Sequence, residues 1–301
     1  MGKIAFVFAG QGAQSVGMGK DLYDAYPTAK AVFDMAGKTV IDLCFNGPET
    51  ELNITINTQP CLFTMDLACA KALNKMGIYA DGVAGFSLGE IPALAYSGIM
   101  EDHQAFDFVS KRAQVMQEAA QVNKGAMFAV LKLAAKDVED LCQSLNKAYP
   151  VNYNCPGQTV VACANEDAEN LQKLVQEKGG KALKLAVSGA FHSPFMNSAS
   201  EAVEEYLSGQ TLKEMNVPLY ANATAKVYDE PKSLLSRQIN NPVLWQKTIE
   251  TMIDDGFDTF IEVGAGKTLA GLIKKINSDV LVFNVNDCSS LEKTVSEVKN
   301  A

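Results

Sequence analysis

Short apolar runs alternate with longer segments of helical period along most of this chain, and no other feature constrains its fold as strongly. Strand-like runs at residues 4–8 and 82–86 are separated by a helical segment near 59–76, and two further helical segments follow at 88–97 and 103–120. Strands joined through helices pair in parallel, and those helices cover the sheet. The alternation therefore predicts an α/β fold built on a parallel sheet.

The middle of the chain has a different order of elements. Its expected elements are strand, helix, two strands, helix and strand, at residues 126–133, 136–147, 151–154, 159–164, 167–178 and 181–187. A β-α-β-β-α-β order is typical of a ferredoxin-like unit of about 60 residues. We expect a ferredoxin-like small subdomain at residues 124–192, inserted into a discontinuous catalytic core formed by residues 1–123 and 193–301.

The α/β alternation resumes after this insertion. The expected elements are a helix at 195–208, a strand at 217–221, helices around Pro242, a strand at 257–263, a helix at 267–275 and a strand at 280–285. They should complete the parallel sheet of the core.

Composition excludes several classes of protein. The 301 residues carry a formal net charge of -9 and no basic run, so we expect no nucleic-acid partner. No apolar run reaches about 18 residues and the first residues do not resemble a signal peptide, which predicts a cytoplasmic protein with no membrane partner. Seven cysteines never spaced as CxxC should be reduced, and two histidines cannot form a multi-imidazole zinc site, so we expect no metal.

The residues Gly85-Phe86-Ser87-Leu88-Gly89 form the sharpest local motif. They directly follow an apolar strand and directly precede a helical pattern, which is the context of a nucleophile elbow. The two glycines permit a cramped strand-to-helix turn that exposes the serine hydroxyl. The alternative is that Ser87 merely caps an ordinary helix. We interpret Ser87 as a nucleophile.

A serine hydroxyl needs a base to remove its proton, and the chain offers two histidines. His103 follows two acidic residues at the start of a polar helix, where a solvated surface role is expected. His192 lies in an irregular segment between a strand and a helix, where catalytic side chains often project. His192 is therefore the predicted base, and no acid that orients its imidazole can be assigned from the residues alone.

Two glycine-rich loops resemble phosphate-binding motifs but lack a required residue. Ser15 replaces the third glycine of a dinucleotide-binding fingerprint, and Ile261 replaces the first glycine of a Walker A loop. We therefore expect no nucleotide cofactor. The first loop still follows a strand, so Gln11 could contribute to an oxyanion hole.

Three polar residues are candidates for substrate contacts. Arg112, if it points inward from its helix, would bind a carboxylate through two hydrogen bonds, although a surface position is the alternative. Asn152 and Asn154 belong to a polar cluster in the insertion that either lines a cleft or forms a turn.

Seven motifs in this order carry a resemblance over essentially the whole chain: FAGQGAQ, GFSLGE, KRAQVMQEA, VNYNCPGQ, GAFHSPFM, QINNPVLW and EVGAGKTL. Together they closely resemble the malonyl-CoA:acyl carrier protein transacylases of fatty acid synthesis. The resemblance implies an α/β-hydrolase-like parallel-sheet core with the ferredoxin-like insertion. It also implies malonyl transfer through a malonyl-serine, with malonyl-CoA and holo acyl carrier protein as substrates and no cofactor.

The resemblance also implies residue roles. Ser87 would be the nucleophile, His192 the base and Arg112 the residue that binds the malonyl carboxylate. Gln11 and the Leu88 amide would form the oxyanion hole. Gln238 matches the family residue whose main-chain carbonyl orients the histidine.

One departure is Phe86, because the family usually has histidine before the nucleophile. An apolar ring there should make the approach to Ser87 drier without removing the assigned base. Two alternatives stay open: a GxSxG serine hydrolase or thioesterase, and a noncatalytic module that binds a carrier protein. We further expect a monomer and, since carrier proteins are typically acidic, a basic docking patch that includes Lys274, Lys275, Lys181 and Lys184.

Overall fold

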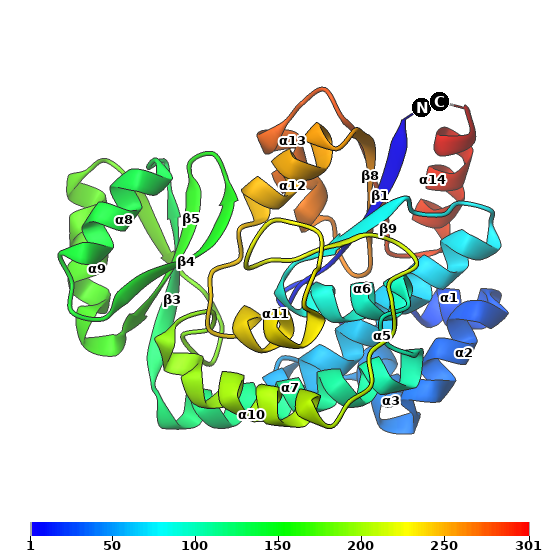
Figure 1. The fold of residues 1–301 in the computed structure, drawn as a ribbon, viewed down its shortest axis with the longest axis horizontal. Helices are drawn as coiled ribbons and strands as arrows, with labels where there is room; N and C mark the ends of the chain where they lie inside the picture. Colours follow the sequence, from blue (N-terminus) through cyan, green and yellow to red (C-terminus); the bar gives the residue numbers. More distant parts are fainter. Residues whose placement is uncertain (1, 301) are drawn as a thin grey trace.

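The computed structural model describes residues 2–300, which form a three-layer α/β core and a second, antiparallel sheet beside it (Figure 1). The strands are β1 (Lys3–Phe8), β2 (Gly82–Gly85), β3 (Gly125–Leu131), β4 (Ala148–Cys155), β5 (Gln158–Ala164), β6 (Lys181–Lys184), β7 (Leu219–Tyr220), β8 (Phe257–Val263) and β9 (Leu281–Val285). The helices are α1 (Lys20–Ala25), α2 (Pro27–Ala36), α3 (Lys38–Asn46), α4 (Glu49–Leu52), α5 (Thr55–Lys75), α6 (Glu90–Ser97), α7 (Asp102–Val122), α8 (Ala135–Gln143), α9 (Ala168–Glu177), α10 (Asn197–Ser208), α11 (Pro231–Gln238), α12 (Trp245–Asp254), α13 (Thr268–Ile276) and α14 (Cys288–Asn300).

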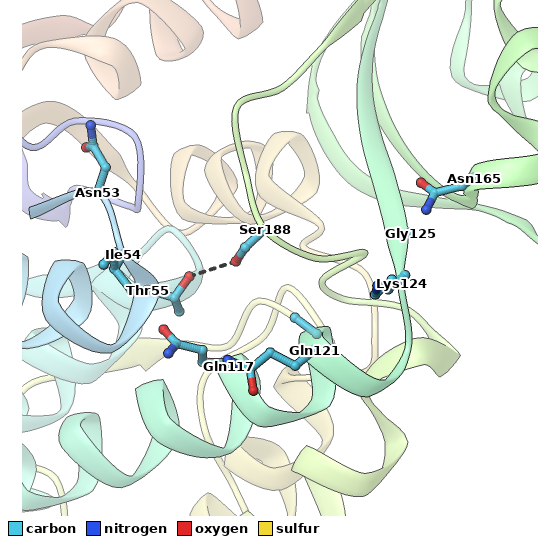
Figure 2. Close-up of a pocket in the computed structure, with 10 residues that line it drawn as sticks. Asn53, Ile54, Thr55, Gln117, Gln121, Lys124, Gly125, Asn165 and Ser188 are labelled. Carbon is cyan, nitrogen blue, oxygen red and sulfur yellow. Dashed lines mark hydrogen bonds between the residues drawn. The ribbon is translucent and has the colours of Figure 1, made fainter. Parts of the chain in front are cut away.

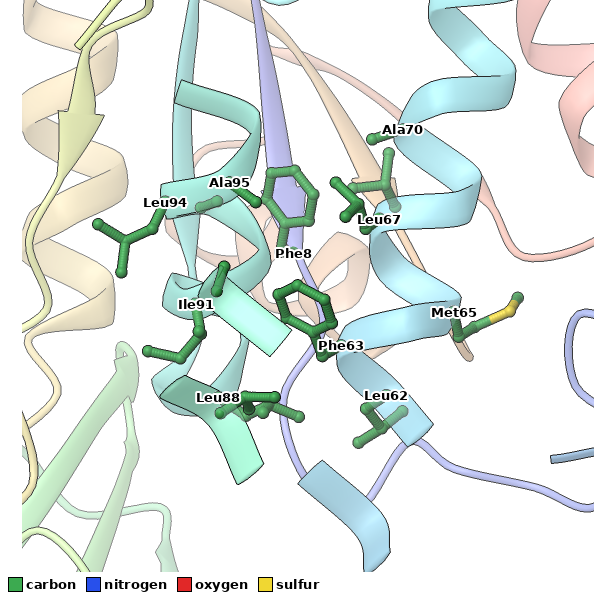
Figure 3. Packing of buried hydrophobic residues seen from close by; sticks show 14 of the residues in the cluster. Phe8, Leu62, Phe63, Met65, Leu67, Ala70, Leu88, Ile91, Leu94 and Ala95 are labelled. Carbon is green, nitrogen blue, oxygen red and sulfur yellow. The ribbon is translucent and has the colours of Figure 1, made fainter. Parts of the chain in front are cut away.

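The core sheet has five strands in the order β7-β2-β1-β8-β9, and all its pairings are parallel. Successive side chains of the central strand β1 point to opposite faces of the sheet, and helices cover both faces. Phe6 and Phe8 pack into the cluster formed with α5 and α6, whereas Ala5 and Val7 pack into the cluster formed with α12 and α13. Figure 3 shows the first cluster around Phe8. The predicted α/β fold with a parallel sheet is confirmed.

The second sheet has the order β4-β5-β3-β6 and is antiparallel throughout. Along the chain its elements follow the predicted β-α-β-β-α-β order, with α8 and α9 as the two helices. Phe128 and Val130 point to these helices, while Met127 and Ala129 belong to the cluster shared with the core. One face of this sheet therefore packs toward the parallel-sheet core, and the cleft between the two sheets contains the candidate site.

Several predicted boundaries were wrong for identifiable reasons. Helix α5 begins at Thr55, four residues before the expected start, because Pro60 near its beginning removes only one early helical hydrogen bond. Strand β7 is limited to Leu219–Tyr220, since Pro218 has no N–H to continue the ladder. The strand expected to reach residue 187 ends at Lys184, after which the chain crosses toward the core. Helices α1 to α4 and α14 were not predicted.

No described helix is both long and apolar enough to cross a membrane. All seven cysteines are free thiols, and six of them are buried.

Candidate active site

Ser87 lies in the sharp turn between β2 and α6, as the glycine pattern predicts. Its φ is 52°, in the left-handed region that is strained for a residue with a side chain. The two flanking glycines permit this turn because the backbone passes close to itself. A Cβ on Gly85 would lie 1.9 Å from the Gly89 carbonyl carbon, and a Cβ on Gly89 would lie 2.1 Å from the Phe8 oxygen. The turn thus requires glycine on both sides of the serine.

The hydroxyl of Ser87 meets the imidazole of His192. Ser87 Oγ lies 2.7 Å from His192 Nε2, and His192 Nδ1 lies 2.9 Å from the main-chain oxygen of Gln238. A carbonyl oxygen can only accept, so Nδ1 carries the proton and Nε2 is free to accept from Ser87. The carbonyl of Gln238 therefore sets the tautomer, a task that a carboxylate performs in many other serine enzymes.

Burial keeps this imidazole neutral. His192 is 3% exposed, and desolvation together with the positive charge of Arg112 lowers its pKa to about 4. The neutral form, which can act as a base, therefore predominates at neutral pH.

Arg112 points inward, which excludes the surface alternative. Its side chain is 1% exposed and donates from Nη1 to Gln59 Oε1 at 2.7 Å. Nη2 donates to Gln238 Oε1 at 2.8 Å and to Ser87 Oγ at 3.2 Å. Nε has no hydrogen-bond partner, and none of the bonded acceptors is a carboxylate. A buried guanidinium beside Ser87 therefore retains unused capacity for an anionic group.

Three further residues hold this arrangement, and sequence reasoning did not identify them: Gln59, Glu90 and Asn222. Asn222 Oδ1 accepts from the Ser87 amide at 2.7 Å, and its Nδ2 donates to the Gly85 carbonyl at 2.6 Å. Asn222 lies 135 residues from Ser87, so no local pattern could indicate it. Glu90 directly follows the predicted turn, and that position was the available signal.

Three of the predicted oxyanion and substrate residues line one cavity of about 270 Å³ next to the turn, whereas Arg112 and Leu88 are not among its lining residues. Gln11, Phe86, Asn152 and Asn154 are among its lining residues, and the Oδ1 atoms of both asparagines are buried without partners. The Gln11 side chain donates to Thr55 Oγ1 at 3.3 Å. Leu88 is buried immediately after Ser87. Asn152 and Asn154 thus line a cleft, which resolves the choice between cleft and turn.

Phe86 forms part of the wall of this cavity. Its ring lies 5.5 Å from that of Trp245 in an edge-to-face arrangement, so the wall is apolar where the family usually has histidine.

A second cavity of about 540 Å³ is lined by Thr55 and Ser188, whose hydroxyl oxygens are 3.2 Å apart (Figure 2). Gln117 and Gln121 of α7 and Lys124 line it as well. It is the larger of the two, but it contains none of the residues predicted to act in catalysis or substrate binding.

His103 lies apart from these groups. It occupies the first turn of α7, nine residues before Arg112, which corresponds to about 13 Å along a helix. Within residues 2–300, no three or more His, Cys, Asp or Glu side chains are grouped so that they could hold a metal ion.

Comparison with known proteins places this chain among acyltransferases. The sequence profile of the acyl transferase domain matches residues 5–299. The chain belongs to this family. The resemblance that the motifs carry is confirmed.

Members similar to this chain include the malonyl CoA-acyl carrier protein transacylase of Bacillus subtilis (strain 168), which is 38% identical over 311 residues covering 99% of this chain and 98% of the relative. The crystal structure of malonyl CoA-acyl carrier protein transacylase from Clostridium perfringens superposes with a TM-score of 0.95 at 39% identity, covering 99% and 98%. A type II PKS acyl-carrier protein in complex with its malonyl-transacylase matches with a TM-score of 0.94 at 33% identity, covering 98% of this chain and 99% of that one.

Proposed function

We propose that this acyl transferase family member moves the malonyl group from malonyl-CoA to the phosphopantetheine thiol of acyl carrier protein, in fatty acid biosynthesis. The observation that carries the proposal is a buried guanidinium, Arg112, within 3.2 Å of a serine hydroxyl that is paired with a neutral histidine. The serine and histidine can carry out acyl transfer. The buried arginine favours an acyl group that bears a carboxylate.

The first half-reaction forms a malonyl-serine. His192 Nε2 takes the Ser87 proton while Ser87 Oγ attacks the thioester carbonyl carbon, and the oxyanion is stabilised by the Leu88 amide and by Gln11. The tetrahedral intermediate then collapses. The carbon–sulfur bond breaks, and the proton on His192 passes to the departing CoA sulfur.

The second half-reaction reverses these roles. His192 takes the proton of the carrier's thiol, the sulfur attacks the malonyl-serine, and the proton returns to Ser87 when the ester bond breaks. No electron transfer and no metal takes part, so the proposal requires only the two substrates and no cofactor.

Substrate binding divides between helix α7 of the core and strand β4 of the second sheet. Arg112 binds the malonyl carboxylate, while Asn152 and Asn154 offer unpaired buried oxygens to the amide N–H groups of the pantetheine arm. Residues 124–192 act as a ferredoxin-like subdomain that contributes the asparagines. Residues 1–123 and 193–301 form the core, which is hydrolase-like in its strand–serine–helix turn. We propose a cytoplasmic monomer.

Incubation with malonyl-CoA, followed by mass spectrometry, tests this function. The wild-type protein should gain a malonyl group on Ser87 and release it when holo acyl carrier protein is added. Ser87→Ala should not be acylated, His192→Ala should be slower by orders of magnitude, and His103→Ala serves as the matched histidine control with near-normal rates. Rapid loss of the malonyl group to water would indicate a hydrolase or thioesterase instead. Absence of acylation in the wild type would favour a noncatalytic carrier-binding module.

A further inference from the structure

The side-chain amide of Gln238 connects separate parts of the site. Its Nε2 donates to the main-chain oxygen of Ser87 at 2.6 Å and to Glu90 Oε2 at 3.0 Å, while its Oε1 accepts from Arg112 Nη2 at 2.8 Å. The bond to His192 comes from the main chain of Gln238 instead. The side chain therefore holds the guanidinium, and the main chain holds the base.

Glu90 is one of three groups that determine which way this amide faces. Glu90 is fully buried. Its Oε2 accepts from the main-chain N–H of Asn222 at 3.2 Å and from the side chain of Gln238. The main-chain oxygen of Ser87 can only accept, the Glu90 carboxylate oxygen accepts, and Arg112 can only donate, so Gln238 must present its NH2 group to the two oxygens and its own oxygen to Arg112. The reversed amide would turn its oxygen toward the Glu90 and Ser87 oxygens and its NH2 toward Arg112, which cannot accept a hydrogen bond.

We propose that Glu90 is a positioning residue for Arg112: by fixing the Gln238 amide, it aims the guanidinium at the acyl group and so sets the preference for carboxylated over uncharged acyl groups. This inference rests on the proposed function, in which Arg112 binds the malonyl carboxylate. The connection passes through an uncharged amide, so Glu90 orients the guanidinium without forming an ion pair that would compete with the substrate.

The ratio of kcat/KM for malonyl-CoA to that for acetyl-CoA tests the proposal. Glu90→Met removes the acceptor, and Gln238→Met removes the amide but keeps the main-chain carbonyl that holds His192. Each should lower the ratio about tenfold, which corresponds to one hydrogen-bonded contact. The double variant should lower it no further, because both changes break the same connection.

Two matched variants separate positioning from general loss of structure. Glu90→Gln keeps an oxygen for Gln238 and Asn222 and can donate to the Tyr228 hydroxyl, so it should restore most of the ratio. Tyr228→Phe removes the hydroxyl that contacts the other oxygen of Glu90, Oε1. It should leave the ratio within about twofold even if the protein becomes less stable.

The proposal is overturned if the ratio is unchanged in Gln238→Met or in a folded Glu90→Met. It is equally overturned if Tyr228→Phe lowers the ratio as much as Glu90→Met, or if the losses in the double variant add. Should Glu90→Met fail to fold, Glu90→Asp takes its place: the shorter side chain withdraws the carboxylate from Gln238 and should lower the ratio, and an unchanged ratio overturns the proposal. The wild type is measured first. Absence of malonyl-serine there refutes the proposed function, whereas normal malonylation with unchanged variant ratios refutes only the role of Glu90.

Discussion

Arg112 retains its positive charge although it is buried. Burial lowers its pKa to about 10, and the nearby Glu90 opposes that change, so the guanidinium is protonated at neutral pH. Such a group is stabilised by a ligand that brings a carboxylate. An acetyl group offers no partner and leaves the buried charge as it was.

Substitution of Arg112 should therefore change acyl selectivity more than it changes chemistry. An unpaired buried polar group costs about 1 to 3 kcal/mol, so the wild type should discriminate against acetyl-CoA by roughly tenfold to several hundredfold. Arg112→Ala should depress malonyl transfer and leave acetyl transfer equal or improved. Arg112→Lys should restore malonyl transfer only partly, since a point charge lacks the bidentate geometry. The measurement is kcat/KM for both thioesters, and a constant ratio in Arg112→Ala would place the carboxylate elsewhere.

The depressed pKa of His192 makes a prediction about stability. In the unfolded chain a histidine titrates near 6.5, whereas folded His192 titrates at about 4, so between these values the unfolded state binds the proton first. The contribution of His192 to the free energy of unfolding is thus complete above about pH 6.5 and falls as the pH drops to 4, by at most about 3 kcal/mol. Urea unfolding at pH 4.5, 5.5 and 7 measures how the free energy of unfolding changes with pH.

His192→Asn supplies the comparison for this measurement. Burial raises the pKa of Glu90 to about 7, and this shift has the opposite sign because its contribution is lost as the pH rises. Since Glu90 is present in both proteins, the difference between them isolates His192. Parallel stability curves would show that His192 is not buried in its neutral form.

At the scale of elements, the strand–turn–helix of β2 and α6 depends on glycines that let two backbones touch. Gly85→Ala would place a methyl group 1.9 Å from the Gly89 carbonyl carbon. We expect it to lower the free energy of unfolding by more than about 3 kcal/mol and to abolish acylation, because Ser87 must move.

Gly271→Ala provides the control in another helix. Gly271 lies inside α13 and an added Cβ there meets nothing within 4 Å. Alanine should raise the free energy of unfolding by about 0.5 to 1 kcal/mol, since it favours helix. Chemical denaturation measures the free energy of unfolding of both variants. Equal changes in the two would contradict the role of the close backbone approach at Gly85.

At the scale of the whole molecule, the net charge of -9 opposes the approach of an acidic carrier protein, so docking needs a local basic surface. The structure reduces the four lysines predicted for this surface to one candidate, because the other three have structural roles. Lys274 Nζ donates to the carbonyl oxygens of Ser278 and Val280, at 3.2 and 2.6 Å, and so closes the end of α13. Lys181 and Lys184 lie on the edge strand β6, where lysines commonly prevent strand pairing between molecules. Lys275 is exposed on α13, the helix that also lines the 270 Å³ cavity.

Charge reversal at Lys275 should weaken the docking of acyl carrier protein without affecting the reaction with malonyl-CoA. Lys275→Glu is expected to raise the KM for acyl carrier protein about threefold to tenfold at low salt, while acylation by malonyl-CoA stays the same. Lys293→Glu on α14, which reverses an exposed lysine paired with Glu297, is the matched control and should leave both rates unchanged. An unaltered KM in Lys275→Glu would remove this residue from the docking surface.

The sequence by itself determined the local part of this protein. Periodicity predicted the parallel α/β core and the β-α-β-β-α-β unit because strand and helix patterns are local, and the Gly-Phe-Ser-Leu-Gly turn marked Ser87 because such a turn needs glycines at fixed offsets. The motifs further predicted that Gln238 lies near His192. Packing decided the rest: Arg112 points inward rather than outward, Asn222 holds Ser87 from 135 residues away, and the Gln238 side chain joins Glu90 to Arg112. Hydrogen bonds between residues distant in sequence depend on how the layers pack, and no periodicity records that packing.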